Sequence, residues 1–341
     1  MSSPTPLVDR WSAVPQWKDM SSLYQEIRAD LGRVEDRLAA WSHSTNPLTA
    51  ETSGYVLRKK GKRLRPALVL LTSRLFNPAS DESVFLASLV ELLHTASLIH
   101  DDIVDRTDVR RGKESVHAKW GPNITVLLGD YLYIKSIGLS LRSRHDRIVR
   151  LLADVSSRMI EGELDECART GDLGITEAQY LEIVEAKTAV LFGACCRIGA
   201  ILGLASPEEE EALAVYGLNL GKTFQIIDDL LDLNGDARVL GKPTLSDLGE
   251  GRITLPLIRT LSADGKAGRA RIKGLVGRKD IKADERLALV EALASNGAFD
   301  YASGRAREFA EKALEAVSRF PDSAARETLI RLALFSLMRD H

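Results

Sequence analysis

The chain has 341 residues and a formal net charge of −2, with 45% hydrophobic and 28% charged residues. This composition is that of a globular chain, long enough for one large domain or two small ones. The near-neutral charge excludes a general attraction to nucleic acid, and three cysteines are too few for a disulfide framework.

Apolar residues recur with helical spacing along almost the whole chain, while alternating β-branched runs are scarce. We expect a loose arm over residues 1–17 and one all-α domain over 18–341. Predicted helices cover 18–41, a segment starting near Leu48, 64–76, 81–105, 123–142, 146–170, 177–203, 207–233 and 251–262, with two or three more after 282. The basic stretch 266–279 lacks aromatic residues and is predicted to be a solvated loop.

No apolar run reaches the ~18 residues of a membrane span, and the N-terminus has no hydrophobic signal region. We therefore expect a cytoplasmic protein that does not span a membrane. Cys195 and Cys196 lie in an apolar segment and are expected to pack as small hydrophobic residues.

Two of the predicted helices end in the same acidic pattern. The apolar run 84–99 leads into Asp101, Asp102 and Asp105, and the helix expected to start at Ser206-Pro207 leads into Asp228, Asp229 and Asp232. Residues i and i+4 share a helix face, so like charges repel there, and the helix C-terminus is already partly negative. Two such clusters indicate that a bound cation offsets the repulsion. Two or three carboxylates do not fill the coordination shell of a metal ion, which suits Mg²⁺ that also binds water and substrate phosphates.

Basic residues flank these clusters. They are Lys62 and Arg65 in GKRLRP, Arg110 and Arg111 after the first cluster, Lys187 before Thr188, and Lys242 and Arg252 after the second cluster. Arg offers planar bidentate donors to phosphate oxygens, and Lys offers a point charge. Together with the acidic residues they outline a site for diphosphates bridged by Mg²⁺.

The motifs GKRLRP, LLHTASLIHDD, RRGKESVHAKWG, GDYL, EGEL, KTAVLF, GKTFQIIDDLLD and GKPTLSDLGEGRITLP occur in this order over roughly residues 45–260. In this the chain resembles the trans-isoprenyl diphosphate synthases, the polyprenyl synthetase family. The resemblance implies an antiparallel helical bundle around a central cavity, usually a homodimer. It also implies Mg²⁺-dependent condensation of isopentenyl diphosphate with an allylic diphosphate.

The resemblance also implies roles for single residues. Asp101, Asp105 and Asp228, supported by Asp102, Asp229 and Asp232, would hold Mg²⁺. Isopentenyl diphosphate would be bound by Lys62, Arg65, His94 and Arg111. The allylic diphosphate would be bound by Arg110, Lys187, Thr188, Gln225, Lys242 and Arg252. The chain departs from the family pattern at Lys60, Glu166, Leu245 and Arg252, of which the last preserves the usual positive charge.

Product length is a further expectation. Ala96 and Ser97 lie one turn before Asp101 on the same helix, and both side chains are small. Short-chain members of the family that it resembles carry aromatic residues there, so we expect a product of geranylgeranyl length or longer, octaprenyl-type above all. The alternative is that these residues only allow close helix packing, and that a bulky residue of 123–142 closes the tunnel that would hold the growing chain. A geranylgeranyl or farnesyl diphosphate synthase is a second alternative.

Three alternative functions compete with this interpretation. Glu91 with His94 and Glu114 with His117 have the spacing of ligands in di-iron helical bundles, but that reading leaves both aspartate clusters unexplained. A terpene cyclase would need no isopentenyl site, and a catalytically silent subunit would be expected to lose an acidic cluster.

Overall fold

A computed structural model describes residues 20–58, 61–110, 112–234, 245–263 and 265–338, which form helices and one short hairpin. The hairpin pairs β1 (Val109–Arg110) with β2 (Lys113–Glu114) in antiparallel fashion. The helices up to the hairpin are η1 (Met20–Ile27), α2 (Arg28–Trp41), α3 (Pro47–Leu57), α4 (Leu64–Arg74) and α5 (Asp81–Val104). Those that follow are α6 (Val116–Ser140), α7 (Asp146–Ala168), α8 (Glu177–Val184), the π-helical segment η2 (Glu185–Ala189), α9 (Val190–Leu202), α10 (Pro207–Asn234), α12 (Ser246–Gly249), α13 (Leu255–Ala263), α14 (Gly265–Lys273), α15 (Ala283–Ser295), α16 (Ala298–Ser318) and α17 (Ala324–Met338).

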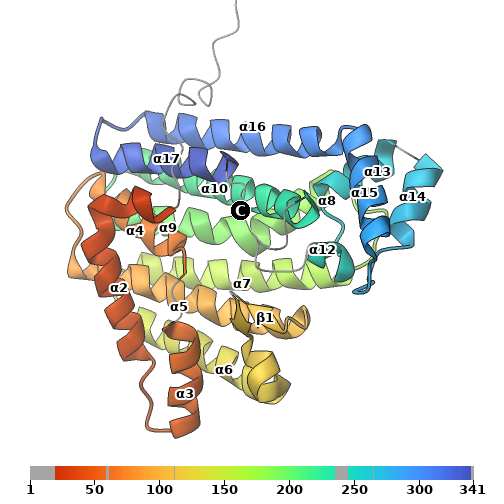
Figure 1. Ribbon diagram of the computed structural model, residues 1–341. Coiled ribbons are helices and arrows are strands. Elements are labelled where there is room, and N and C mark those ends of the chain that lie inside the picture. Colours follow the sequence, from red (N-terminus) through yellow and green to blue (C-terminus); the bar gives the residue numbers. More distant parts are fainter. Residues whose placement is uncertain (1–19, 59–60, 111, 235–244, 264, 339–341) are drawn as a thin grey trace, which may run out of the picture.

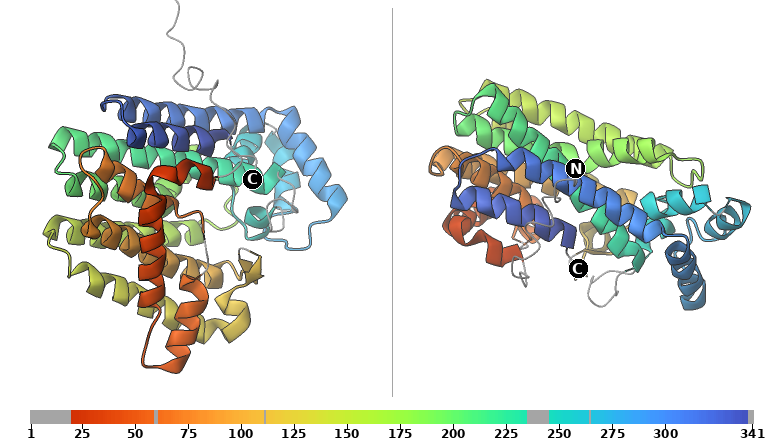
Figure 2. Two further views of the ribbon diagram at one scale, coloured as in Figure 1. Left: turned by 60° about the vertical axis from the view of Figure 1, so that its left-hand side comes forward. Right: turned by 90° about the horizontal axis from the view of Figure 1, so that it is seen from above.

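The long helices lie side by side in stacked layers (Figures 1 and 2). Helices α16 and α17 cover α10, which packs on α9, while α5 packs between α4 and α6. The short helices α12 to α15 gather at one end of the bundle, where α5 and α10 also terminate (Figure 1). This architecture confirms the predicted all-α bundle.

Helix α5 forms the centre of the larger core. Its apolar residues from Val84 to Leu93 are almost completely buried, and Ser80 caps its first turn by accepting a hydrogen bond from the Ser83 amide. The prediction that no segment reaches the length of a membrane span was wrong for this helix. Among the described residues, α5 alone is long and apolar enough, but 72% of its apolar window is buried in the protein, as in a core helix.

Helix α10 begins as the sequence predicted. Ser206 and Glu209 exchange hydrogen bonds between side chain and backbone across the first turn. Gly217 then lets α10 approach α9 closely, because a Cβ there would lie 2.5 Å from the Phe192 carbonyl oxygen, and Gly221 does the same for η2, where a Cβ would lie 2.6 Å from Cα of Ala189. This contact places the η2 segment beside α10 near the latter's acidic end.

Several boundaries differ from the predicted ones. The segment α6 consists of a short helical turn from Val116 and a long helix from Pro122, separated by the non-helical residue Gly121 (φ +79°), so the long helix begins close to the predicted residue 123. The predicted helix 177–203 contains the π-helical segment η2. The basic stretch is not simply a loop, since α14 covers residues 265–273. The predicted arm 1–17 lies outside the described residues. Cys195 and Cys196 are buried in the core, as expected.

Candidate active site

The acidic ends of α5 and α10 open onto one cavity of about 1470 Å³. Its lining includes residues of the short helices α8, α12 and α15, and Ile183, Ile253 and Val290 make part of the wall apolar. Nine of the site residues predicted from the sequence line this cavity: Asp101, Asp105, Arg110, Lys187, Thr188, Gln225, Asp228, Asp229 and Arg252.

The carboxylate of Asp101 lies in a strongly unfavourable environment for a negative charge. Burial raises its pKa to about 7, and the carboxylates of Glu163 and Asp105 act in the same direction, while Lys187 only partly opposes them. The end of α5 adds its own partial negative charge. The positive charges of the protein therefore do not balance this carboxylate, which fits a role in binding a cation.

Neighbouring aspartates of the two clusters have different partners, because consecutive helical residues are turned by ~100° about the axis. Asp102 is buried and forms an ion pair with Arg110. Asp229 is buried and accepts hydrogen bonds from Tyr180 (2.6 Å) and Gln225 (2.8 Å), and burial and nearby Asp247 raise its pKa. Asp229 still lines the cavity, but its oxygens are engaged in holding α8 against α10.

Asp232 organises the segment after the second cluster. It is fully buried, and its side chain accepts a hydrogen bond from the Asp247 amide at 3.1 Å. Its carbonyl accepts from the Leu245 amide at 2.8 Å, and Leu245 has a left-handed φ of +61°. Glycine is the usual residue in that conformation, which is the physical meaning of the Leu245 departure noted in the sequence. Asp102 and Asp232 do not line the cavity.

Lys187 reaches the cavity from the η2 segment. The extra residue of a π-helical turn pushes it out of the regular helix, toward α7. Gly162 of α7 permits this approach, because a Cβ there would lie 2.7 Å from the Lys187 amide nitrogen. The ammonium group contacts Glu163 at 2.7 Å and also Glu166 at 2.5 Å. Although burial lowers the pKa of Lys187, these carboxylates raise it above its ordinary value.

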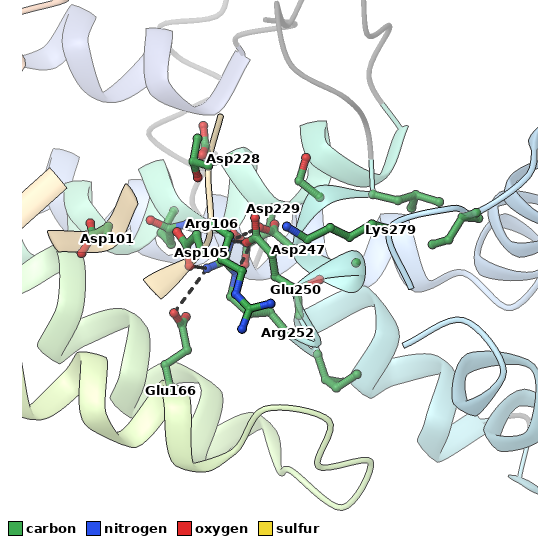
Figure 3. A pocket seen from close by; sticks show the side chains of 18 of the residues that line it. Asp101, Asp105, Arg106, Glu166, Asp228, Asp229, Asp247, Glu250, Arg252 and Lys279 are labelled. Carbon is green, nitrogen blue, oxygen red and sulfur yellow. Dashed lines mark hydrogen bonds and ion pairs between the residues drawn. The ribbon is translucent and has the colours of Figure 1, made fainter. Parts of the chain in front are cut away.

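Arg252 lies at the centre of the acidic residues and joins several elements. Its guanidinium contacts Asp105 at 2.8 Å, Asp247 at 3.0 Å and Glu166 at 3.6 Å, and also pairs with Glu250. Figure 3 shows Glu166 reaching from α7 toward this group. Arg252 and Lys187 therefore share Glu166, and both cations line the cavity.

A second group of basic residues comes from the start of α4 and from α5. An Arg65 guanidinium nitrogen lies 2.8 Å from Nε2 of His94, and the guanidinium stacks on Phe192 with its carbon 4.8 Å from the ring centre. Lys62 is exposed just before α4. None of these three residues lines the cavity. Lys60, Arg111 and Lys242 lie outside the described residues.

Several cavity residues were missed by the sequence reasoning. Tyr180, Asp247, Glu250 and Lys279 line the cavity, and in Figure 3 the amino group of Lys279 points toward Asp229 and Asp247. Glu163 holds Lys187. The EGEL and SDLGEGR motifs contain Glu163, Asp247 and Glu250, so those motifs were a usable signal, whereas Lys279 lies in the stretch that had been predicted to be a loop.

The candidate ligands for a divalent cation are the carboxylates at the two helix ends. No group of three His, Cys, Asp or Glu side chains within the described part of the chain could hold a metal ion by itself. Mg²⁺ bound through one or two carboxylates, waters and substrate phosphates does not require such a group. Asp101 and Asp105 on one helix and Asp228 on the other bring hard oxygen donors to one cavity, so these residues fit a metal shared with a substrate.

The di-iron alternative does not fit the structure. Glu91 is buried and pairs with Arg63 at 2.6 Å, and Glu114 is exposed on β2. The two Glu-x-x-His pairs therefore do not face a common centre. The residues proposed to control product length, Ala96 and Ser97, do not line the cavity either, and Ala96 is buried in the main core. That proposal stays a prediction.

Comparison with known proteins supports the same assignment. Residues 46–293 match the family model described as polyprenyl synthetase. The octaprenyl diphosphate synthase of Haemophilus influenzae is 34% identical over 315 residues, covering 92% of this chain and 94% of the relative. The geranylgeranyl diphosphate synthase of Methanosarcina mazei is also 34% identical, over 94% of this chain and 99% of the relative.

Solved structures agree. A polyprenyl synthase from Caulobacter crescentus, solved with calcium and isoprenyl diphosphate, superposes with a TM-score of 0.90 at 34% identity, covering 96% of this chain and 100% of that one. A decaprenyl diphosphate synthase from Rhodobacter capsulatus gives a TM-score of 0.88 at 32% identity, covering 95% and 100%. With its helical fold, its two acidic helix ends and its matched motifs, this chain belongs to the polyprenyl synthetase family and is a prenyltransferase.

Proposed function

We propose that the protein condenses isopentenyl diphosphate head-to-tail with an allylic diphosphate, in the presence of Mg²⁺, to give an all-trans polyprenyl diphosphate of long-chain type. One observation carries the proposal: two acidic helix ends 127 residues apart meet at one cavity together with Lys187 and Arg252. An octaprenyl-type product is favoured because an octaprenyl diphosphate synthase matches over nearly the full length of both chains.

The allylic diphosphate lies against the acidic cavity in this proposal. Mg²⁺ held by Asp101, Asp105 and Asp228 would neutralise the charge that builds on the departing diphosphate. Lys187 and Arg252 donate hydrogen bonds to the same oxygens, and Thr188 and Gln225, whose side chains are 3.0 Å apart, orient the group. The carbon–oxygen bond then breaks, and both of its electrons leave with the diphosphate.

The second substrate completes the reaction. Lys62, Arg65 and His94 hold isopentenyl diphosphate, with Arg111 by family resemblance. The double bond of this substrate supplies two electrons to the allylic cation, forming the new carbon–carbon bond. A proton is then lost to the released diphosphate, and a new double bond forms. Buried apolar side chains such as Ile183 and Ile253 keep water from the cation.

Condensation is tested by measuring diphosphate release. The protein should release diphosphate when Mg²⁺, isopentenyl diphosphate and an allylic diphosphate are all present, and not when either substrate is omitted. Release from the allylic substrate alone, with a cyclic hydrocarbon product, would instead establish a terpene cyclase.

Product length is tested at the positions one turn before Asp101. Ala96→Phe or Ser97→Phe should shift the product to shorter chains, because a ring there would fill the space expected for the growing chain. The mass of the products provides the measurement, with Ala302→Phe on distant α16 as a control for general damage to a helical core. Unchanged chain length in soluble, active Ala96 and Ser97 variants would place the length control on another helix.

We also propose a homodimer in the cytoplasm. Helices α6 and α7, with the residue that caps the end of α6, expose apolar side chains that would gain from burial against a second copy: Val126, Leu127, Ile134, Leu141, Ile160 and Leu164. Leu127 and Ile134 are 67% and 72% exposed. Light scattering should therefore report a dimer for the natural protein and a smaller species for Leu127→Asp or Ile134→Asp. A monomeric natural protein would contradict the proposal.

A further inference from the structure

Arg63 lies between two residues of the proposed isopentenyl diphosphate site but points away from solvent. It is only 7% exposed, although it stands beside exposed Lys62 and two residues before Arg65. Its φ of +48° is left-handed, which is uncommon for a residue with a Cβ. A buried guanidinium in this backbone conformation requires compensating contacts.

Two carboxylates supply these contacts. The Nε and Nη2 atoms of Arg63 donate to the two oxygens of Glu35 on α2 at 2.6 and 2.9 Å. Its Nη1 donates to Glu91 on α5 at 2.6 Å, and Glu91 is buried as well. Burial lowers the pKa of Arg63, but the contacts with Glu35 and Glu91 outweigh burial and raise it above its ordinary value. Only a planar guanidinium can serve both carboxylates in this way.

The location of this network links it to the second basic group. Arg63 is the residue that precedes α4, and its carbonyl accepts the first hydrogen bond of that helix from the Ala67 amide at 3.0 Å. Glu91 lies one turn before His94 on α5, on the same side of the helix. The network therefore fixes the start of α4 against α5 at the level where Arg65 approaches His94 to 2.8 Å.

We propose that Arg63 is a positioning residue for isopentenyl diphosphate: its ion pairs with Glu35 and Glu91 set the separation of Lys62, Arg65 and His94. The proposal rests on the function proposed above for those three residues. In this proposal Arg63 does not itself bind the substrate, because it is buried and its Nε, Nη1 and Nη2 atoms each donate to a carboxylate.

The chain offers a matched control at the opposite end of α4. Arg74 also ties α4 to the N-terminal helices, with contacts of 2.7 Å to Asp30 on α2 and 3.7 Å to Glu26 on η1. It lies eleven residues beyond Arg63, at the end of α4 that is opposite to Arg65. Loss of Arg74 should therefore lower the stability of the protein without changing its affinity for isopentenyl diphosphate.

The test compares Arg63→Lys and Glu91→Gln with Arg74→Lys. Each purified variant is assayed for the Michaelis constants of both substrates, for equilibrium binding of isopentenyl diphosphate and for its thermal midpoint. We expect Arg63→Lys and Glu91→Gln to raise the constant for isopentenyl diphosphate about tenfold while changing that for the allylic diphosphate less than about twofold. Arg74→Lys should lower the thermal midpoint and leave both constants within about twofold.

Two outcomes overturn the proposal. One is an equal rise of both Michaelis constants in the Arg63 and Glu91 variants. The other is a change in isopentenyl diphosphate binding that Arg74→Lys reproduces at the same loss of thermal midpoint. The natural enzyme is assayed first, since absence of condensation in it would reject the proposed function rather than the role of Arg63.

Discussion

Arg252 contacts Asp105 at 2.8 Å, so an ion pair joins the acidic end of α5 to the segment that follows the acidic end of α10. The same guanidinium contacts Asp247 and Glu166. The two acidic clusters are thus connected through a cation that we propose also binds the allylic diphosphate. Replacing single carboxylates around Arg252 by their neutral amides should therefore change turnover and substrate affinity.

The first prediction concerns the aspartates themselves. Asp101→Asn or Asp228→Asn should leave the protein folded, because each change removes a repelled negative charge. Turnover should fall by about two orders of magnitude or more, since the charge on the departing diphosphate would lose a metal ligand. Circular dichroism and steady-state turnover provide the measurements.

Asp300→Asn, in an exposed position on α16, is the control for this prediction. It should retain the turnover of the natural enzyme. Near-normal condensation by either the Asp101 or the Asp228 variant would argue against a shared metal site.

The second prediction concerns Glu166, which stands where the family commonly has Gln. Its carboxylate contacts both Lys187 and Arg252 and so competes with the diphosphate for the same cations. Glu166→Gln should lower the Michaelis constant for the allylic diphosphate about threefold and leave that for isopentenyl diphosphate unchanged.

Glu161→Gln serves as the comparison, because Glu161 is exposed on the same helix and does not line the cavity. It should change neither constant. A weaker affinity for the allylic substrate in Glu166→Gln would instead mean that the carboxylate positions Lys187 productively.

The third prediction is a pH dependence of stability without metal. The pKa of Asp101 is about 7 in the folded chain, mainly through burial, against 3.8 when unperturbed. Between these values the folded state binds a proton that the unfolded state does not, so this residue's contribution to stability is lost as pH rises toward 7. The stabilisation produced by Asp101→Asn should therefore grow with pH.

Thermal unfolding in the presence of a chelator, from about pH 5 to pH 8, provides the measurement. The Asp101→Asn variant should keep part of the pH dependence of stability that the natural protein shows, because burial also raises the pKa of Glu250 to about 7. A difference between the two proteins that does not vary with pH would contradict the assignment of a raised pKa to Asp101.

The fourth prediction concerns the contact between α7 and the η2 segment. Gly162→Ala would place a Cβ 2.7 Å from the Lys187 amide, so η2 must shift. We expect a loss of about 1–3 kcal/mol in the free energy of unfolding and weaker binding of the allylic diphosphate.

Gly304→Ala on α16 is the matched control, because nothing lies within 4 Å of a Cβ there. That change should stabilise the helix by about 1 kcal/mol and leave kinetics unchanged. If both alanine variants behave alike, the close approach of α7 does not position Lys187.

The sequence predicted much of this molecule because its strongest signals are local. Helical periodicity gave the long helices, and the repeated acidic pattern gave Asp101, Asp105 and Asp228, which share the cavity. Asp102 and Asp232 do not line the cavity, because Asp102 pairs with Arg110 and Asp232 accepts a hydrogen bond from the Asp247 amide. Adjacent helical residues face different directions, and a pattern alone does not say which of them meets the cavity.

Other features depend on tertiary contacts that no single segment encodes. The π-helical turn at Lys187 exists beside Gly162 of another helix, and Arg63 is buried only because Glu35 and Glu91 meet it. The sequence does not distinguish the three basic residues of GKRLRP, which are Lys62, Arg63 and Arg65. Tertiary packing buries Arg63, whereas Lys62 and Arg65 are proposed to bind substrate.

The most direct test of the central claim is the mass of the product. The purified natural enzyme is incubated with Mg²⁺, labelled isopentenyl diphosphate and farnesyl diphosphate as the allylic primer. The account predicts a linear all-trans polyprenyl diphosphate much longer than the primer, with the octaprenyl product most abundant, and no product when Mg²⁺ is chelated. Failure to extend farnesyl diphosphate at all would contradict it.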